Sequence, residues 1–205
     1  VWAALVLGIQ LPGLYVRNDV ACALLAVPSR APASVAGQNV LTGYTPQELT
    51  FIVGKHLSYY RGEHYIKNLF PTLGELKVVF FSAIKIIQPE FNVPAEMAQA
   101  VNMTAAELVK YMQPVERDSL RLVVQKFIED GAKADLKRWM QTVDVTAARA
   151  GLLLCADLEI AKKIIAAEPQ LPGDLPPPDK LKELIMFSVS EQYLGLRKAL
   201  GIAVG

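Results

Sequence analysis

The stretch that decides the fold reads Glu48-Leu49-Thr50-Phe51-Ile52-Val53-Gly54-Lys55-His56-Leu57-Ser58-Tyr59-Tyr60-Arg61. It overlaps Thr45-Pro46-Gln47-Glu48, which is a strong start signal for a helix. The Thr45 hydroxyl can accept a hydrogen bond from a backbone N–H of the first turn, Pro46 suits the first helical position, and Glu48 completes a capping box. The pattern predicts a single helix that begins at Pro46 and carries Leu49, Ile52, Val53, His56, Tyr60 and His64 on successive turns.

Short apolar runs precede this helix, and longer amphipathic runs follow it. Runs bounded by Gly, Pro, Asn and Asp are typical of strands. They occur at residues 1–9, 13–16, 21–27 and 33–36, although periodicity also allows a buried helix at 1–9. Helical patterns occur at residues 73–87, 94–101, 104–112, 115–130, 134–167, 179–187 and 190–200. Strands first and helices afterwards predict an α+β fold, with a small N-terminal antiparallel or mixed sheet packed on a mainly helical body.

Composition excludes several classes of protein. Apolar residues make up 52% of the 205 residues and charged residues 20%, which is too hydrophobic for an intrinsically disordered chain. A net charge of +1 argues against a general nucleic-acid binder, and the charge-free apolar runs are too short to span a bilayer. Two cysteines, Cys22 and Cys155, cannot form a disulfide framework and favour a reducing, cytoplasmic compartment. Because the chain begins at Val1 without a Met, we expect a piece of a longer protein.

The stretch 48–61 resembles the active-site helix of gluzincin metallopeptidases of the CAAX-prenyl endopeptidase type. In that family the helix reads roughly Glu-Leu, then apolar residues, then Gly-His-Glu-Leu-x-His. The flanking letters of this motif are present, but its three chemical residues are replaced. Lys55 stands at the position of the first zinc His, His56 at that of the catalytic Glu, and Tyr59 at that of the second zinc His.

A second stretch, Asp144-Val145-Thr146-Ala147-Ala148-Arg149-Ala150-Gly151, resembles the family's Glu-x-x-Ala-Asp-x-x-Gly helix. There Asp144 replaces the third zinc ligand and Ala148 the supporting Asp. The run Ala33-Ser34-Val35-Ala36 resembles the edge strand over the family's cleft and is the candidate peptide-binding edge. The resemblance implies a zincin-like, degenerate metallopeptidase domain over residues 1–168. Residues 169–205 would then be a Pro-rich connector and a helical extension packed on the same domain.

The replaced residues do not suit zinc chemistry. A catalytic zinc needs about three protein ligands and one open position, whereas Lys55 is a cation and a Tyr59 phenol is protonated at neutral pH. The general base is also missing. The resemblance therefore implies an inactive pseudo-peptidase without zinc or another cofactor. It would serve as an interaction or scaffold module for a protein or peptide partner or for further domains of a longer chain.

The replaced ligands also suggest what fills the former metal position. Lys55 and Tyr59 are four residues apart and share one helix face. We expect the Lys55 ammonium to pair with Asp144, with the Tyr59 hydroxyl as a further partner. In the alternative arrangement Lys55 extends into solvent and Asp144 merely lies early on its helix.

Two other functions remain open at this point. One is a metal-dependent peptidase with a non-standard ligand set built from His56, Glu63, His64 and Asp144. The other is a plain helical binding module, which the absence of a strand beside the 46–61 helix would favour. We interpret Cys22 and Cys155 as inert buried thiols. The basic group Lys133, Lys137 and Arg138 is interpreted as a solvated surface.

Overall fold

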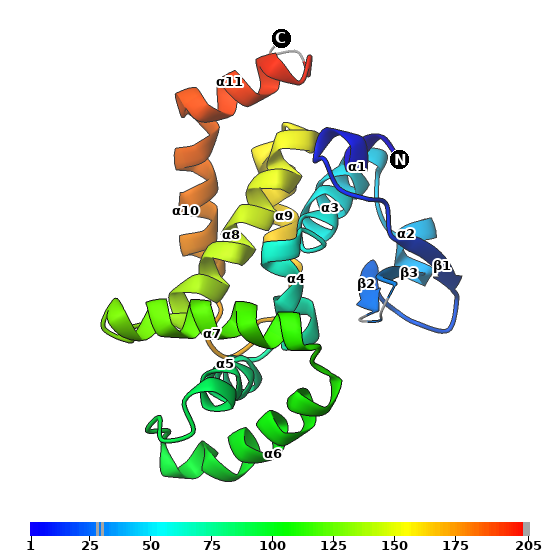
Figure 1. The fold of residues 1–205 in the computed structure, drawn as a ribbon. Helices are drawn as coiled ribbons and strands as arrows, with labels where there is room; N and C mark the ends of the chain where they lie inside the picture. The colour runs from blue at the N-terminus through cyan, green and yellow to red at the C-terminus, as the bar shows by residue number, and fades with distance from the viewer. Residues whose placement is uncertain (28, 30, 203–205) are drawn as a thin grey trace. The chain divides into compact units, whose positions relative to one another are not determined.

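A computed structural model describes residues 1–27, 29 and 31–202 (Figure 1). The chain divides into two compact units, one formed by Val1–Leu69 with Trp139–Gly205 and the other by Phe70–Arg138. The elements in chain order are α1 (Trp2–Val6), β1 (Gly13–Arg17), β2 (Leu24–Val27), β3 (Ala33–Gly37), α2 (Gln38–Thr42), α3 (Pro46–Ser58), α4 (Gly62–Leu69), α5 (Leu73–Ile87), α6 (Ala95–Tyr111), α7 (Pro114–Glu129), α8 (Leu136–Cys155), α9 (Leu158–Ala167), α10 (Pro177–Ser188) and α11 (Glu191–Ala199). The predicted α+β class, with a small mixed sheet and a mainly helical body, is confirmed.

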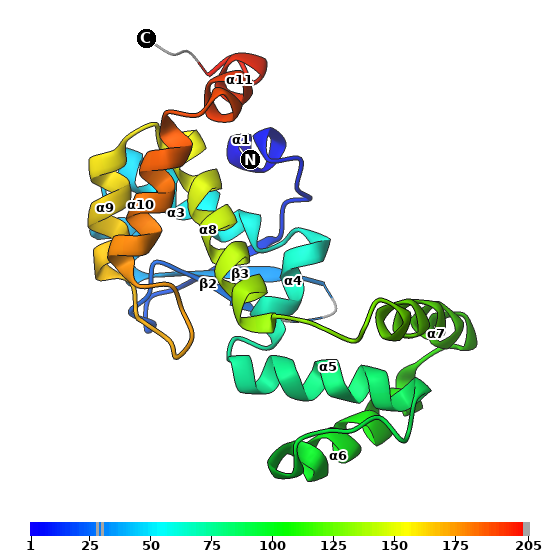
Figure 2. The same ribbon diagram turned by 90° about the vertical axis from the view of Figure 1, so that its left-hand side faces the viewer.

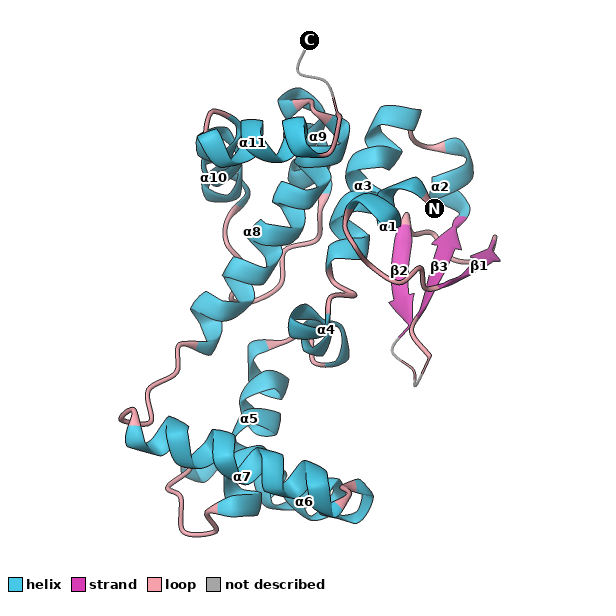
Figure 3. Ribbon diagram, turned by 45° about the horizontal axis from the view of Figure 1, so that its top comes forward, coloured by secondary structure: helices cyan, strands magenta, loops and turns pink. Residues whose placement is uncertain are grey.

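The sheet of the first unit has three strands in the order β1-β3-β2 (Figure 3). β1 runs parallel to β3, and β2 runs antiparallel to it. The prediction that Ala33–Ala36 form an edge strand is therefore wrong, because β3 is paired on both sides. Small side chains allow β3 to be the most buried strand, and a Cβ on its Gly37 would meet the Val20 carbonyl oxygen at 2.5 Å.

Residues 1–9 contain the short helix α1 rather than a strand, as the alternative interpretation allowed. Ala3 and Ala4 are buried against Leu57 of α3 and Leu154 of α8. A helix turns two adjacent small residues toward one neighbouring surface, whereas a strand would point them to opposite faces.

The body of the first unit is formed by α3, α8, α9, α10 and α11, which all contribute to one core. Figure 1 shows α8 and α9 between α3 and α10, and α9 contacts both of these helices (Figure 2). The axes of α3 and α8 approach closely because both helices carry glycine at the crossing. A Cβ on Gly151 would meet the Phe51 carbonyl oxygen at 2.7 Å, and one on Gly54 would meet the Gly151 Cα at 3.0 Å. Phe51 itself is fully buried in this core.

Two predicted helices are interrupted in the structure. The helix that begins at Pro46 has the predicted capping box but ends at Ser58, so His64 lies on the separate helix α4. The predicted helical tract 134–167 divides into α8 and α9 around Ala156, which has a left-handed φ of 57°. The Asp157 carboxylate accepts hydrogen bonds from two backbone N–H groups of α9 and starts the new helix there.

The second unit consists of α5, α6 and α7. The bounds of α5 agree with the predicted helix, and a capping box of Thr72 and Glu75 starts it. The predicted helix start at Thr104 is wrong, because Thr104 lies in the middle of α6. In mid-helix the backbone N–H groups are already bonded within the helix, so a capping residue has no orphan donor to satisfy. Ser82 of α5 donates to the Val101 carbonyl oxygen of α6 at 3.0 Å.

The C-terminal helices pack on the body of the first unit, as expected. α10 and α11 contribute Leu184, Phe187 and Tyr193 to its core. The separate helical unit 70–138 was not predicted from the sequence. None of the helices in the described part of the chain has the length and apolar character needed to cross a membrane.

Candidate functional site

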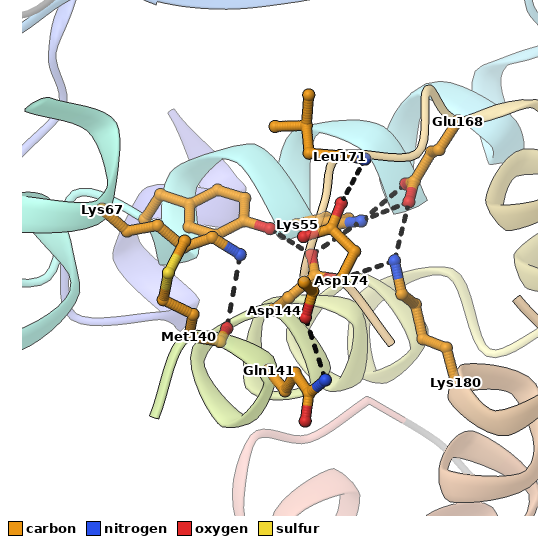
Figure 4. A network of polar contacts seen from close by, with 11 residues as sticks. Lys55, Lys67, Met140, Gln141, Asp144, Glu168, Leu171, Asp174 and Lys180 are labelled. Carbon is orange, nitrogen blue, oxygen red and sulfur yellow. Dashed lines mark hydrogen bonds and ion pairs between the residues drawn. The ribbon is translucent and has the colours of Figure 1, made fainter. Parts of the chain in front are cut away.

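The three positions matched to the zinc ligands converge at one point between α3 and α8 (Figure 4). The Lys55 Nζ lies 3.2 Å from the Asp144 Oδ1. The Tyr59 hydroxyl donates a hydrogen bond to the same carboxylate oxygen. The predicted ion pair and its tyrosine partner are confirmed, and the alternative in which Lys55 extends into solvent is wrong.

Two charged residues that the sequence did not reveal complete the arrangement. Glu168, just after α9, accepts hydrogen bonds from the Lys55 Nζ on both carboxylate oxygens at 2.6 Å. Lys180 of α10 lies 2.5 Å from the Asp144 Oδ2 and 3.2 Å from the Glu168 Oε2. We call Lys55, Asp144, Glu168 and Lys180 the charge cluster. Its two cations and two anions neutralise one another.

Burial makes the charge cluster an unusual feature. The Lys180 residue is only 2% exposed, and the side chains of Lys55 and Asp144 are 11% and 8% exposed. Charged groups are seldom buried to this extent unless they are paired. Glu168 and Lys180 belong to no motif recognised in the sequence. They reach the site from later segments, the end of α9 and α10.

The pKa directions follow from this pairing. Burial by itself raises the pKa of Asp144, but the ammonium groups of Lys55 and Lys180 outweigh burial and hold that pKa well below its ordinary value. Burial likewise lowers the pKa of Lys180, and the carboxylates of Asp144 and Glu168 outweigh it and raise that pKa. Burial and the adjacent Asp144 raise the pKa of Tyr59 well above its ordinary value. Asp144 and Lys180 are thus charged at neutral pH, and the tyrosine remains a donor.

Polar contacts bind the Pro-rich connector to α8 beside the charge cluster (Figure 4). The Gln141 side chain donates to the Gly173 carbonyl oxygen at 2.9 Å. The Asp174 carboxylate accepts from the Leu171 backbone N–H at 2.9 Å. Lys67 of α4 donates to the Met140 carbonyl oxygen at 3.3 Å, and burial lowers its pKa.

Ala148 is fully buried in the apolar core that contains Phe51. At the position where the resemblance places a supporting Asp, its methyl group can neither accept a hydrogen bond nor orient a ligand. α8 therefore offers the site only one carboxylate, that of Asp144, among the matched positions.

His56 faces the sheet rather than the charge cluster. Its Nε2 lies 2.8 Å from the Ser34 Oγ, which lies 2.9 Å from the Tyr60 hydroxyl, and Tyr60 donates to the Ala33 carbonyl oxygen at 2.6 Å. Since Tyr60 uses its proton on that carbonyl, the serine donates to Tyr60 and the His56 Nε2–H donates to the serine. His56 is therefore not placed to take a proton from Ser34. The Ser34–His56 hydrogen bond also places β3 beside α3. A missing strand at this position would have favoured a plain helical binding module, and the strand is present.

The alternative metal set is not assembled. His64 is buried on α4, where its Nδ1–H donates to the Ser58 carbonyl oxygen at 3.1 Å. Glu63 is exposed and pairs with Arg61. Among the described residues, no three His, Cys, Asp or Glu side chains lie where they could hold one metal ion. The ligand set of the alternative function is therefore not brought together. His56 bonds to Ser34, His64 lies on the separate helix α4, and Asp144 pairs with the lysines of the charge cluster.

A cavity of about 450 Å³ opens beside the charge cluster. This volume lies in the range of small-ligand and peptide pockets. Its lining comes from the β2 region, α2, α3 and the end of α9, and comprises Ala21, Cys22, Ala23, Leu24, Asn39, Tyr44, Ile52, Lys55, His56, Tyr59, Ile164, Ala167, Glu168 and Pro169. Cys22 lines this cavity and is half-buried, not fully buried as predicted. Cys155 is buried, and burial raises the pKa of its thiol to about 11, so it is inert as predicted.

Burial of His56 makes stability depend on pH in a defined window. Burial lowers the pKa of His56 from 6.5 to about 4. Between these values the unfolded chain binds a proton that the folded chain does not, so stability is lost as the pH falls. We expect the free energy of unfolding to drop by about 2 kcal/mol more between pH 7 and pH 5 in the wild type than in His56→Gln. Urea denaturation at both pH values measures this difference, and equal drops in the two proteins would contradict it.

Comparison of the chain with models of protein families, with curated proteins and with solved structures finds no match.

Proposed function

We propose that this chain is a catalytically inactive, metallopeptidase-like domain that binds an extended peptide in its cleft and acts as an interaction module. The observation that carries the proposal is the convergence of Lys55, Tyr59 and Asp144, which were matched to the three ligand positions by two separate motifs. The resemblance implies that the two motifs face one another, so this convergence supports it. The resemblance to the CAAX-prenyl endopeptidase type accounts for that convergence.

The residues present do not fit a zinc ion. Zinc is bound by neutral imidazole, thiolate or carboxylate groups, and here two ammonium groups occupy the region around the one matched carboxylate. Since the charge cluster is neutral, it leaves no negative charge to offset a divalent cation. At the position of the general base, His56 donates its Nε2–H to Ser34. We therefore infer a binding role and derive no hydrolytic step.

The open edge of β2 is where a peptide would bind. The Gly37 N–H donates to the Ala23 carbonyl oxygen, so the paired register makes 25/35 and 27/33 the hydrogen-bonded pairs of the antiparallel ladder. The backbone groups of Leu24 and Ala26 then point away from β3. Main-chain bonds to such an edge give affinity for an extended peptide. Leu24 also lines the cavity, so a side chain of that peptide can enter it.

Metal content and proteolysis test the inactive assignment. We expect the purified chain to contain no stoichiometric zinc and to leave casein intact with or without added zinc. A matched variant with Lys55→His, Tyr59→His, Asp144→Glu and Lys180→Met restores the ligand types and removes the remaining cation. This variant should bind about one zinc ion per chain. Stoichiometric zinc with chelator-sensitive cleavage in the wild type would overturn the proposal, and a folded variant that binds no zinc would reject the resemblance.

Peptide capture tests the binding role. Panning a random peptide library on the wild type should yield peptides whose binding is lost in Ala26→Pro. Proline removes the edge-facing N–H of Ala26 without breaking a bond to β3, which edge strands tolerate. The control is Ala26→Thr, which keeps the N–H and should retain binding. Gln38→Pro is unsuitable as a control, because the Gln38 N–H bonds to the Val20 carbonyl oxygen. Peptides that bind the proline variant as well as the wild type would contradict binding at this edge.

The two unpaired cysteines, Cys22 and Cys155, support a cytoplasmic location as part of this proposal.

A further inference from the structure

A second cavity, of about 370 Å³, lies within the helical unit 70–138. It is separate from the charge cluster and from the β2 edge. Its walls come from one face of α5, from the loop after α5, from the end of α7 and from the segment that leads into α8. They comprise Leu73, Lys77, Phe80, Phe81, Phe91, Phe127, Ala132, Ala134, Asp135, Leu136 and Lys137.

The floor of this cavity is aromatic. The rings of Phe80 and Phe127 meet edge to face at 5.4 Å between centroids. The ring of Phe81 lies 5.7 Å from that of Phe80 and 6.3 Å from that of Phe91. All four rings are half-buried, so part of each ring remains open to the cavity. Covering this exposed aromatic surface with an apolar group lowers the free energy.

The rim of the cavity is cationic. Lys77 and Lys137 both line it, are exposed, and have no ion-pair partner within the described ranges 1–27, 29 and 31–202. The one carboxylate among the lining residues, Asp135, accepts a hydrogen bond from the Arg138 backbone N–H at 2.9 Å and so caps the start of α8. The lining therefore carries one net positive charge. Lys137 belongs to the basic group Lys133, Lys137 and Arg138, whose sequence alone indicates a solvated surface.

We propose that this cavity binds a single-chain amphiphile with an anionic head, such as a fatty carboxylate. The apolar chain covers the phenylalanine rings, and the head group lies between the ammonium groups of Lys77 and Lys137. The volume lies in the range of small-ligand pockets. Charge complementarity favours the anion, because both exposed ammonium groups attract a carboxylate and have no such attraction for a neutral head.

Titration calorimetry on the whole chain tests this assignment with dodecanoate, kept below its micelle concentration, and with dodecanol. Dodecanoate should bind at least about tenfold more tightly than dodecanol, since charge-assisted hydrogen bonds to the lysines contribute only for the anion. The double variant Lys77→Met and Lys137→Met keeps both side-chain stems. It should weaken dodecanoate binding about tenfold or more and leave dodecanol binding unchanged.

Two further variants localise the site. Lys85→Met removes the same charge from α5 outside the cavity lining and should change neither affinity. Ala134→Phe, at an exposed lining position, should fill the cavity and abolish binding of both ligands. Equal affinities for dodecanoate and dodecanol, unchanged binding in the lysine double variant, or no binding at all would overturn the proposal. Binding to anionic vesicles without binding to dodecanoate would instead assign the lysines to a membrane surface and would also overturn it.

Discussion

Lys180→Met is expected to lower the free energy of unfolding by about 3–5 kcal/mol at pH 7, the cost of breaking a buried ion pair by removing one partner. Methionine keeps the length and the apolar stem of the side chain, so little packing is lost. The Lys180 side chain is 2% exposed, and its ammonium pairs with both Asp144 and Glu168. Without it, two carboxylates share the single cation Lys55 in a poorly hydrated site. Urea denaturation followed by circular dichroism measures the change.

A matched control and a rescue separate charge from packing. Lys162→Met breaks an exposed pair with Glu159 at 3.7 Å and should cost only about 0–1 kcal/mol. Adding Asp144→Asn to Lys180→Met restores a balance of one cation and one anion and should recover part of the loss, which a double-mutant cycle quantifies. A cost of Lys180→Met no greater than that of Lys162→Met would show that the charge cluster does not hold α10 to the body.

Gly151→Val is expected to cost about 3 kcal/mol or more, at the upper end for overpacked cores. A Cβ at this position meets the backbone carbonyl oxygen of Phe51 at 2.7 Å and the Phe51 ring at 2.9 Å. Backbone cannot rotate away as a side-chain tip can, so α3 and α8 must separate. That separation also pulls Tyr59 and Lys55 away from Asp144. Denaturation of the variant measures the cost.

The control for this prediction is a glycine with open space around it. Gly195 lies inside α11, and a Cβ there would have no neighbouring atom within 4 Å among the described residues. Gly195→Ala should therefore raise the free energy of unfolding by about 0.5–1 kcal/mol, because alanine has the higher helix propensity. If Gly151→Val left stability unchanged or raised it, as Gly195→Ala is expected to do, the close crossing of α3 and α8 would not be a determinant of this fold.

The residues of the candidate site form two groups: those whose positions could be expected from the sequence, and those that only the packing of later helices brings to the site. Lys55 and Tyr59 could be placed together because four residues make one helical turn. Asp144 could be added only because the stretch 144–151 resembles a second motif of the peptidase family, and the resemblance implies that this motif faces the first. Glu168 and Lys180 could not, since neither lies in a motif and each reaches the site by the packing of a later helix. The prediction that His56, Tyr60 and His64 lie on successive turns of one helix is wrong, because the chain leaves the helix after Ser58.

The edge strand shows the same limit in the sheet. The apolar run at residues 33–36 identifies a strand, but nothing within a strand says which neighbours will pair with it. β1 and β2 pair with its two sides. The small residues of β3 fit this central position, but small residues by themselves do not identify a central strand.

By itself, the sequence determined the class of fold, the start of α3 with its capping box and the bounds of α5. These depend on local periodicity and on capping chemistry, which act over a few residues. The pairing of Lys55 with Asp144 was expected only from the resemblance, beside the alternative in which Lys55 extends into solvent. The tertiary structure alone decided the order of the strands, the break between α3 and α4, the separate unit 70–138 and the entry of Glu168 and Lys180 into the charge cluster. The reason is that each of these features depends on which apolar surfaces pack against one another. The ammonium of Lys180 meets its carboxylate partners only where α10 packs on the body.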